Sequence, residues 1–521
     1  MQNATIGHKV VKNTVYNAAG RLWGILIAFL LTPYIINKLG VERYGVWAVV
    51  GVLTGYFGLL DFGIGTSFVK YISEFYAKKD FKKINQIAST GIAFYLLLAI
   101  FLIIGGYFIL NPLLSLFKIP AGMYDEAGFV FLAGIVLFAL SNPVSVLSSL
   151  QGGLQRMDIS NKLYLAMSVP NVIGTIYALE KGYGLPGLMI NNAIIFFFTA
   201  IISIIIAYRL LPELSISSAY FDVKMLWKLF NYGYKLQIAR LSSMISSQID
   251  KLLIGYYLSV GLITFYQLGS SVVEQAKTAV LLFLSALIPA FSELDARGDR
   301  KKLLDGYARI SKYIALISIP LFSFVFISAY QLIRVWMGPG YEKAAWIIMI
   351  LAPGWLVAIL SGVRGVMVQA IDKPELEMQA GLVAAAVNIP LSIFFIIKFG
   401  FVGVALGTTI ALSCSVLYSF LVVHNKLGIP KVKFLEATVF RPFAVSITLC
   451  LVFWLLFRTF PGVFSAENRF ITFGVLLAES IFFFGSYIAV LVYVKPLDLQ
   501  DRLLLQDKLP HLKKLIIKLS R

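Results

Sequence analysis

Charge, cysteine and histidine are all scarce in this 521-residue sequence. Charged residues make up 14% of it, against about 25% in an average soluble protein. The two cysteines, Cys414 and Cys450, are expected to be reduced packing residues, because free cysteine is commonly buried. The three histidines are scattered without metal-ligand spacing, and no glycine-rich phosphate loop with Lys and Ser or Thr occurs. The sequence therefore predicts no metal, no cofactor and no direct use of ATP.

Long apolar runs are what the sequence has instead. Hydrophobic residues make up 59% of the chain, and the mean hydropathy is +0.84. Runs such as GIAFYLLLAIFLIIGGYFIL and IIFFFTAIISIIIAY belong to stretches near the roughly 20 residues that cross a bilayer as a helix. The sequence predicts an all-α, polytopic membrane protein.

Hydropathy and breaks in charge predict fourteen spans. They lie near 14–37, 44–62, 86–110, 127–149, 163–180, 185–208, 229–257, 261–291, 307–334, 344–370, 377–398, 402–424, 437–460 and 469–494. The segment 63–78 is expected to follow the second span as a continuing or kinked amphipathic helix.

The distribution of lysine and arginine gives the expected orientation. With the N-terminus in the cytoplasm, most of the 45 basic residues fall in cytoplasmic segments. Fourteen spans then return the C-terminus to the cytoplasm. This topology and attraction to anionic lipid account for the net charge of +19, so nucleic acid is not an expected partner. The tail 495–521 alternates Leu and Ile with basic residues, which predicts a helix lying on the membrane, with disorder as the alternative.

A twelve-residue segment occurs twice in the chain. SEFYAKKDFKKI at 73–84 returns as SELDARGDRKKL at 292–303, 219 positions later, with six identical residues. The same offset places Arg21 on Arg240, and offsets of 214 and 216 place LQRMD on VQAID and YGLPGL on FGFVGV. Because the matches occur in the same order, they indicate a duplicated unit of six helices.

The duplication predicts the organisation of the whole chain. An N-lobe (1–209) and a C-lobe (227–425) hold six helices each, two further helices lie in 436–494, and the tail 495–521 follows. Since six is even, the lobes have the same orientation in the membrane. Parallel repeats of this kind build transporters with a substrate site between the halves, which alternate access by rocking.

Ten ionisable residues fall inside the predicted spans, where charge is costly and usually functional. The basic ones are Arg21, Lys235, Arg240, Lys251, Lys277 and Arg364, and the acidic ones are Asp61, Asp250, Glu274 and Glu479. Their helical phase predicts a net cationic cavity flanked by the first, second, seventh and eighth spans. Such a cavity suits a phosphate-bearing substrate, because Arg binds phosphate oxygens bidentately and Lys acts as a point charge. We assign the six basic residues to substrate binding, and Glu274, Asp250 and Asp61 to coupling with H⁺ or Na⁺.

Structural roles compete with these assignments. Arg21 and Arg240 could bind carbonyl groups at helix breaks or pair with a nearby acid, and Glu274 with Lys277 could form only an ion pair three residues apart. Five others lie near the ends of their spans and could be snorkelling or loop charges, namely Lys235, Asp250, Lys251, Asp61 and Arg364. Glu479 is isolated in the last span and receives no assignment.

One segment carries a family resemblance. YGVWAVVGVLTGYFGLLDFGIGTSFVKYISEF at 44–75 resembles the signature region of the polysaccharide transporter family, with LLDFGIG (59–65) and the preceding LGVERYGVW (39–47) as its most specific parts. These proteins are oligosaccharide flippases of the multidrug/oligosaccharidyl-lipid/polysaccharide (MOP) exporter superfamily. The two helices after the duplicated core also fit, and the resemblance covers most of the chain.

The resemblance implies a fold and a function. The fold is two six-helix lobes around a V-shaped cavity, like that of MATE transporters of the same superfamily. The function is to carry polyprenyl-pyrophosphate-linked oligosaccharide from the cytoplasmic to the outer leaflet of the cell membrane, driven by a proton or sodium gradient. Such a protein makes no covalent bond and is not an enzyme. The expected partners are lipid-linked oligosaccharide and membrane lipid, with a polysaccharide polymerase and a chain-length regulator beside it.

Three other functions remain open. A multidrug or organic-cation antiporter would need an acidic or aromatic cavity, whereas the predicted one is cationic. A lipid II flippase has the same charge requirement and is disfavoured only by the LLDFGIG-type signature. A membrane glycosyltransferase or polymerase would need a sizeable catalytic loop with acidic residues, and the loops between the predicted spans are short.

Overall fold

The computed structural model describes residues 6–519 apart from 285–290, 293–294, 296–297, 372, 374, 460–468, 499–500 and 503–516. Within its helices, side chains are described except at 6–19, 21, 235–236, 238–240, 242–243, 245–247 and 282–284. Three predicted site residues, Arg21, Lys235 and Arg240, are therefore placed on their helices, while their side chains lie outside the described part.

The described residues of the first half form seven α-helices. They are α1 (Ile6–Leu39), α2 (Val41–Phe57), α3 (Ile64–Ala77), α4 (Phe81–Leu116), α5 (Tyr124–Gly153), α6 (Met157–Glu180) and α7 (Gly184–Leu210). The predicted amphipathic segment is α3, which buries Phe68, Ile72 and Phe75 on one face. It is kinked away from α2 by a short 3₁₀ turn, η1 (Gly58–Asp61).

The described helices of the second half follow the order of the six predicted spans with two helices split, while the sequence counterpart of α3 lies largely outside the described residues. These helices are α8 (Val223–Tyr257), α9 (Val260–Leu284), α11 (Arg300–Ile327), α12 (Ala329–Met337), α13 (Glu342–Leu360), α14 (Gly362–Ala370), α15 (Glu375–Phe399) and α16 (Phe401–Leu427). The predicted spans 307–334 and 344–370 are interrupted at Ser328 and Ser361. Two helices follow the repeat, α18 (Arg441–Thr459), entered through α17 (Lys431–Leu435) and a π-turn at Glu436–Phe440, and α20 (Arg469–Val494).

Eleven helices of the described chain are long and apolar enough to cross a membrane by length and composition. They account for every predicted span except α6, α8 and α9. These three are full-length helices with more polar residues, which is expected of helices that face a hydrated interior rather than lipid. The protein is an all-α, multi-pass membrane protein with about fourteen spans.

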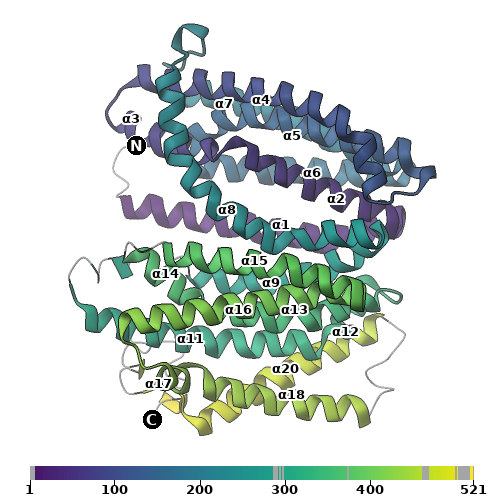
Figure 1. The fold of residues 1–521 in the computed structure, drawn as a ribbon, viewed down its shortest axis with the longest axis vertical. Coiled ribbons are helices and arrows are strands. Elements are labelled where there is room, and N and C mark those ends of the chain that lie inside the picture. The colour runs from purple at the N-terminus through teal and green to yellow at the C-terminus, as the bar shows by residue number, and fades with distance from the viewer. Residues whose placement is uncertain are drawn as a thin grey trace. The chain divides into compact units, whose positions relative to one another are not determined.

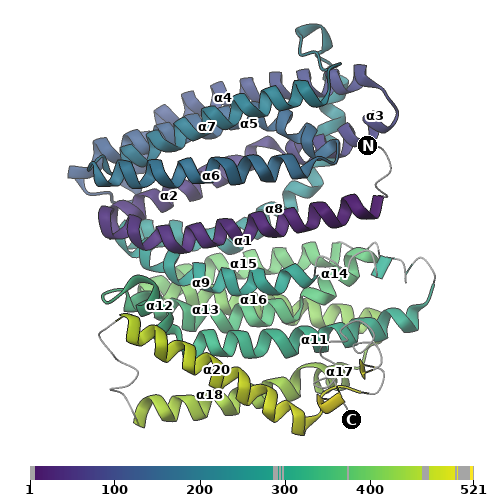
Figure 2. The ribbon, with the colours of Figure 1, turned by 180° about the vertical axis from the view of Figure 1, so that it is seen from behind.

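The chain divides into two compact units, Met1–Thr264 and Phe265–Arg521. In the first unit α4 packs on α5, α5 on α7, and α7 on α6, as Figures 1 and 2 show from opposite sides. In the second unit α11 packs on α13, α13 on α16, and α16 on α15. These are the same pairings between the third, fourth, fifth and sixth predicted spans of each half. The packing thus repeats as the sequence does, while the predicted residue limits of the lobes stay a prediction.

The repeated twelve-residue segment ends in the same helix cap in both halves. Asp80 accepts a hydrogen bond from the backbone N–H of Lys83 at 3.1 Å, and Asp299 accepts one from the backbone N–H of Lys302 at 3.1 Å. Both carboxylates also form ion pairs with those lysine side chains, at 3.1 and 2.7 Å. An aspartate at this position satisfies one of the unpaired donors that begin a helix, so the duplicated Asp and Lys start α4 and α11.

The two cysteines differ in their surroundings. Cys450 on α18 is half-buried, and its thiol lies 3.8 Å from the carbonyl oxygen of Ser323. Cys414 on α16 is exposed. The expected packing role is therefore wrong for Cys414, because its side chain lies on an exposed face of α16.

The first residues of the predicted tail contact α11. The carboxylate of Asp501 is fully buried, and it accepts hydrogen bonds from Lys312 and, at 2.7 Å, from the hydroxyl of Tyr313. Arg309 lies 3.6 Å from the same carboxylate. Most of the tail, 503–516, lies outside the described residues, so its membrane-surface helix stays a prediction.

Candidate functional site

The LLDFGIG segment forms the break between α2 and α3. After η1 the backbone turns through left-handed conformations at Phe62 (φ 52°) and Gly63 (φ 77°). The side chain of Asp61 accepts a hydrogen bond from the N–H of Gly63 at 2.7 Å, which closes this turn. The motif thus has a physical basis, since an acceptor and a glycine are both needed to reverse the chain here.

A side chain from α8 stabilises the same break. The amide nitrogen of Gln237 donates to the carbonyl oxygens of Gly58 and Leu59, at 3.1 and 2.9 Å, and to Asp61 at 3.1 Å. The hydroxyl of Tyr95 lies 3.4 Å from the other oxygen of Asp61. Asp61 is therefore a buried residue that holds α2, α3 and α8 together, not a loop charge, and its role in ion coupling stays a prediction.

Asp250 and Lys251 lie thirteen and fourteen residues after Gln237 on α8. At the rise of about 1.5 Å per residue in an α-helix, this places them about 20 Å from Gln237. Both are buried, with 1% and 7% of their surface exposed. The ammonium of Lys251 donates to the side-chain oxygen of Gln248 at 2.8 Å. These two charges therefore do not snorkel, and within the first unit the structure does not bring them together with Asp61.

Lys277 is held by two neighbours in the second unit. Its ammonium lies 2.5 Å from the carboxylate of Glu274 and 4.0 Å from the centre of the Trp355 ring. The ion pair is asymmetric, because 15% of the Lys277 side chain is exposed against 50% of Glu274. The face of an indole ring attracts a cation, so Trp355 and Glu274 together hold the ammonium group of Lys277 on a polar face of α9.

Arg364 and Glu479 are buried inside the second unit. Arg364, on α14, is 3% exposed and donates to the carbonyl oxygen of Val416 at 3.4 Å. Glu479 received no role from the sequence. Its carboxylate accepts a hydrogen bond at 3.4 Å from Ser328, the residue at which α11 ends and α12 begins. Substrate binding by the six basic residues stays a prediction. These residues are Arg21, Lys235, Arg240, Lys251, Lys277 and Arg364.

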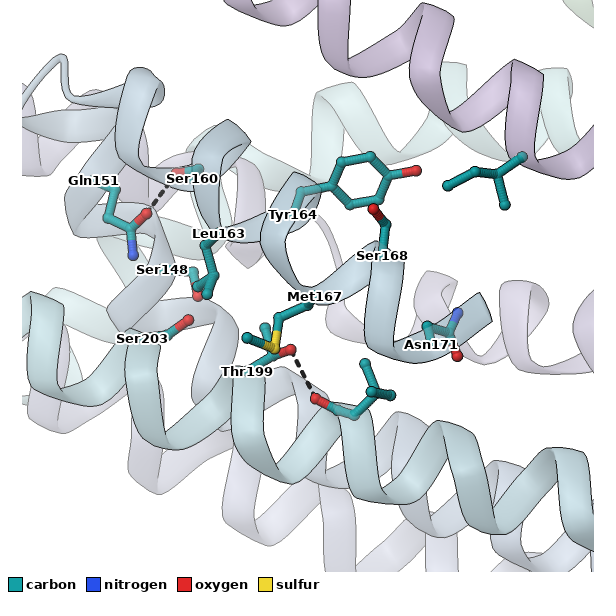
Figure 3. Close-up of a pocket in the computed structure, with 12 residues that line it drawn as sticks. Ser148, Gln151, Ser160, Leu163, Tyr164, Met167, Ser168, Asn171, Thr199 and Ser203 are labelled. Carbon is teal, nitrogen blue, oxygen red and sulfur yellow. Dashed lines mark hydrogen bonds between the residues drawn. The ribbon is translucent and has the colours of Figure 1, made fainter. Parts of the chain in front are cut away.

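Sequence reasoning missed a pocket in the first unit, between α1, α5, α6 and α7, whose surface is mostly apolar but carries several hydroxyl and amide groups. Its polar lining includes Ser160, Tyr164, Ser168 and Asn171 of α6 (Figure 3). These residues recur at steps of four, four and three, which places them on one face of the helix. That spacing is the signal in the sequence that could have identified them.

Comparison with known proteins agrees with the fold and the signature. A family model described as "Polysaccharide biosynthesis protein" matches residues 10–295. A Shigella flexneri protein named "Putative O-antigen transporter" is 20% identical over 77% of this chain and 94% of its own length. A Haloferax volcanii protein named "Probable low-salt glycan biosynthesis flippase Agl15" is 20% identical over 88% of this chain and 93% of its own length.

Solved structures share the fold at low identity. The lipid II flippase MurJ, in an inward closed conformation, superimposes with a TM-score of 0.66 and 18% identity, over 92% of this chain and all of its own. An inward-facing multidrug resistance MATE transporter of the MOP superfamily gives a TM-score of 0.66 and 14% identity, over 79% of this chain and 98% of its own. The chain therefore shares the fold of these two transporters.

Proposed function

Because the chain belongs to the polysaccharide biosynthesis protein family, we propose that it is a flippase for lipid-linked oligosaccharide. It would carry a polyprenyl-(pyro)phosphate-linked oligosaccharide from the cytoplasmic to the outer leaflet of the cell membrane, for the synthesis of a surface polysaccharide. The observation that carries this proposal is the family match, which contains the whole LLDFGIG region. The names of the two relatives support it, and the MOP fold suits transport without a chemical reaction.

The cationic residues supply the chemistry that this substrate needs. A pyrophosphate in a low-dielectric interior must be paired with positive charge. Lys277 is the described residue best suited to this role, because its charge is held on α9 by Trp355 and Glu274. The other proposed ligands are Arg21, Lys235, Arg240, Lys251 and Arg364.

Coupling to a proton or sodium gradient is part of the proposal. A phosphate that binds Lys277 would compete with Glu274 for the same ammonium group. Substrate binding would therefore be linked to the binding of H⁺ or Na⁺ by the Glu274 carboxylate. Asp250 and Asp61 are the alternative coupling residues. Both termini would be cytoplasmic, and a polymerase and a chain-length regulator are the proposed partners.

The test is rescue of surface polysaccharide in cells that lack their own flippase. Wild type should restore export, whereas Arg21→Ala and Arg240→Ala should fail at equal membrane expression. If the variants also restore export, the proposed function stands and the arginine pair is not needed for it. If wild type fails with several oligosaccharides but rescues cells depleted of a lipid II flippase, or exports a cationic dye, the proposed substrate is wrong.

A further inference from the structure

The pocket between α1, α5, α6 and α7 has a volume of about 320 Å³. Eight of its twelve lining residues carry a hydroxyl or a carboxamide group, and none of the twelve carries an acidic or basic side chain. Tyr164 at its rim is 49% exposed, so the pocket is open rather than sealed. It lies wholly within the first unit and uses none of the charged residues assigned above.

Several hydrogen-bond donors of this pocket are left open. The side-chain oxygen of Gln151 accepts from the hydroxyl of Ser160 at 2.5 Å, and Figure 3 shows its amide nitrogen directed away from Ser160. Within the described part of the chain, neither this nitrogen nor the hydroxyls of Ser148 and Ser203 donate a hydrogen bond to the protein. Gln151 and Ser203 are only 1% and 3% exposed. None of these three groups is among the fully buried, unpaired side-chain atoms of the described chain, so their donors are accessible from the pocket and available to a partner that enters it.

The second half of the chain shows that this openness is not imposed by the fold. With the offset of 216 that relates α7 to α16, Ser203 corresponds to Ser419. Ser419 is equally buried, at 2%, but its hydroxyl donates to the carbonyl oxygen of Ser415 at 2.8 Å. The serine hydroxyl at this position thus donates to a carbonyl of its own helix in the second half, at Ser419, but not in the first half, at Ser203.

Other groups of the pocket are fixed by the protein. The hydroxyl of Ser168 accepts from the indole N–H of Trp23 at 2.8 Å and donates to the carbonyl oxygen of Leu165 at 2.7 Å. The side-chain oxygen of Asn171 accepts from Asn191 at 2.8 Å. The pocket therefore combines a preformed wall with a set of free donors, which is the arrangement that small-molecule sites use.

The lining selects the chemistry of the ligand. An ion would lose its hydration without gaining a counter-charge, which is strongly unfavourable. An acyl chain would leave the hydroxyl and amide groups unpaired. A sugar ring matches both parts, because its hydroxyls can accept from Gln151, Ser148 and Ser203 while its C–H groups contact the ring of Tyr164. A volume near the lower end of ligand pockets, about 300–1,000 Å³, admits one ring rather than a chain.

We propose that this pocket binds a single neutral sugar residue. If the proposed function holds, that residue belongs to the lipid-linked oligosaccharide, and the pocket contributes to recognition of the sugar while the cationic residues bind the pyrophosphate. The binding of a free sugar does not depend on that function, so the two can be tested separately.

The direct test is binding of free sugars to the purified full-length protein, measured by saturation-transfer NMR titration. Glucose, galactose and N-acetylglucosamine are the neutral probes, and glucuronic acid is the charged one. At least one neutral sugar should bind, and glucuronic acid should bind at least tenfold more weakly. Ser203→Ala and Ser148→Ala should each weaken the neutral sugar about fivefold to tenfold, in line with the loss of one hydrogen bond.

Ser149→Ala is the matched control. Ser149 neighbours Ser148 on α5, but its hydroxyl donates to the carbonyl oxygen of Ser145 at 2.8 Å and does not line the pocket. This variant should bind as wild type does. Absence of binding by all three neutral sugars, equal binding of glucuronic acid, or equal loss in Ser149→Ala and Ser148→Ala would each overturn the proposal.

Export separates this proposal from the proposed function. If wild type exports oligosaccharide but binds no free sugar, and Ser203→Ala exports at the wild-type rate, the pocket proposal fails and the flippase stands. If wild type binds a neutral sugar and Ser203→Ala binds it about fivefold to tenfold more weakly, while no oligosaccharide is exported, the sugar site stands and the flippase fails.

Discussion

Gly63 and Gly233 approach each other so closely that neither has room for a side chain. A Cβ atom on Gly63 would lie 2.2 Å from the carbonyl oxygen of Gly233, and one on Gly233 would lie 2.3 Å from the carbonyl oxygen of Gly63. The contact joins the start of α3 to α8, beside the hydrogen bonds of Gln237. The glycine of LLDFGIG is therefore required twice, for its left-handed backbone and for this contact.

Four glycine substitutions should separate these two requirements. Gly63→Ala combines a left-handed residue, at about 1–2 kcal/mol, with a steric clash, at about 1–3 kcal/mol. Gly428→Ala has only the first cost, because its backbone is also left-handed (φ 69°, ψ 29°) and nothing lies within 4 Å of a Cβ atom there, and Gly233→Ala has only the second. Gly51→Ala has neither. The midpoint of thermal unfolding in detergent should fall in the order Gly51, then Gly428 or Gly233, then Gly63. Equal midpoints for Gly63→Ala and Gly428→Ala would contradict the close contact.

The duplicated helix caps should respond to acid. Hydrogen bonds from the backbone and side chain of Lys83 hold the pKa of Asp80 below its ordinary value, and those from the side chain and backbone of Lys302 do the same for Asp299. A lowered pKa means that the caps stabilise the fold fully above the unfolded pKa, about 4, and lose this effect as the pH falls through the folded pKa.

Asp80→Ala should therefore lower the unfolding midpoint by the same amount at pH 7 and pH 5, and by less near pH 3. Asp80→Asn keeps a capping oxygen and should stay closer to wild type at pH 7. A destabilisation by Asp80→Ala that does not shrink in acid would show that the carboxylate charge is irrelevant to the cap.

Lys277 should contribute to transport more than to stability. If its ammonium contacts phosphate, Lys277→Gln removes a charge-assisted hydrogen bond of about 1.5–3 kcal/mol and should slow the initial rate of export at least tenfold. Lys398→Gln is a suitable control, because Lys398 also lies over aromatic rings, at 5.9 Å from Phe394 and 5.6 Å from Phe399, but at the end of α15. If Lys277→Gln exports at the wild-type rate, Lys277 does not bind phosphate, and its role is limited to the ion pair with Glu274.

The buried carboxylate of Asp501 should be one of the most sensitive positions of the second unit. Asp501→Asn removes the buried charged partner of Lys312, whose side chain is only 12% exposed, and leaves it facing the exposed Asp498. Breaking a buried pair in this way costs about 3–5 kcal/mol. Asp498→Asn is the control, since Asp498 is 58% exposed and 3.5 Å from Lys312, and its loss should cost less than about 1 kcal/mol. Both are measured as unfolding midpoints, and similar effects would show that the burial of Asp501 does not matter.

The sequence allows prediction of features that depend on neighbours along the chain. The described helices agree with the predicted spans because each is long and apolar, or because it repeats a helix of the other half. The amphipathic α3 was visible for the same reason. The duplicated Asp and Lys were visible as a repeat, although their use as a helix cap appears only in the structure.

Features that depend on distant residues could not be predicted. Asp61 was taken for a coupling residue or a loop charge because its partner, Gln237, is 176 positions away. The split between α11 and α12 at Ser328 involves Glu479, 151 positions away. The open hydroxyl of Ser203 and the closed one of Ser419 are indistinguishable in sequence, since only the packing of neighbouring helices decides which hydroxyl is free.

The contact between Asp501 and Lys312 also sets an order on biosynthesis. The two residues are 189 positions apart, so Lys312 is made on the order of 10–40 s before its acid at a synthesis rate of about 5–20 residues per second. During that interval α11 is complete but its buried lysine lacks this carboxylate. Insertion of the second unit can therefore begin at the ribosome, whereas its final packing must wait until the last helix has entered the membrane and the chain beyond it has folded back.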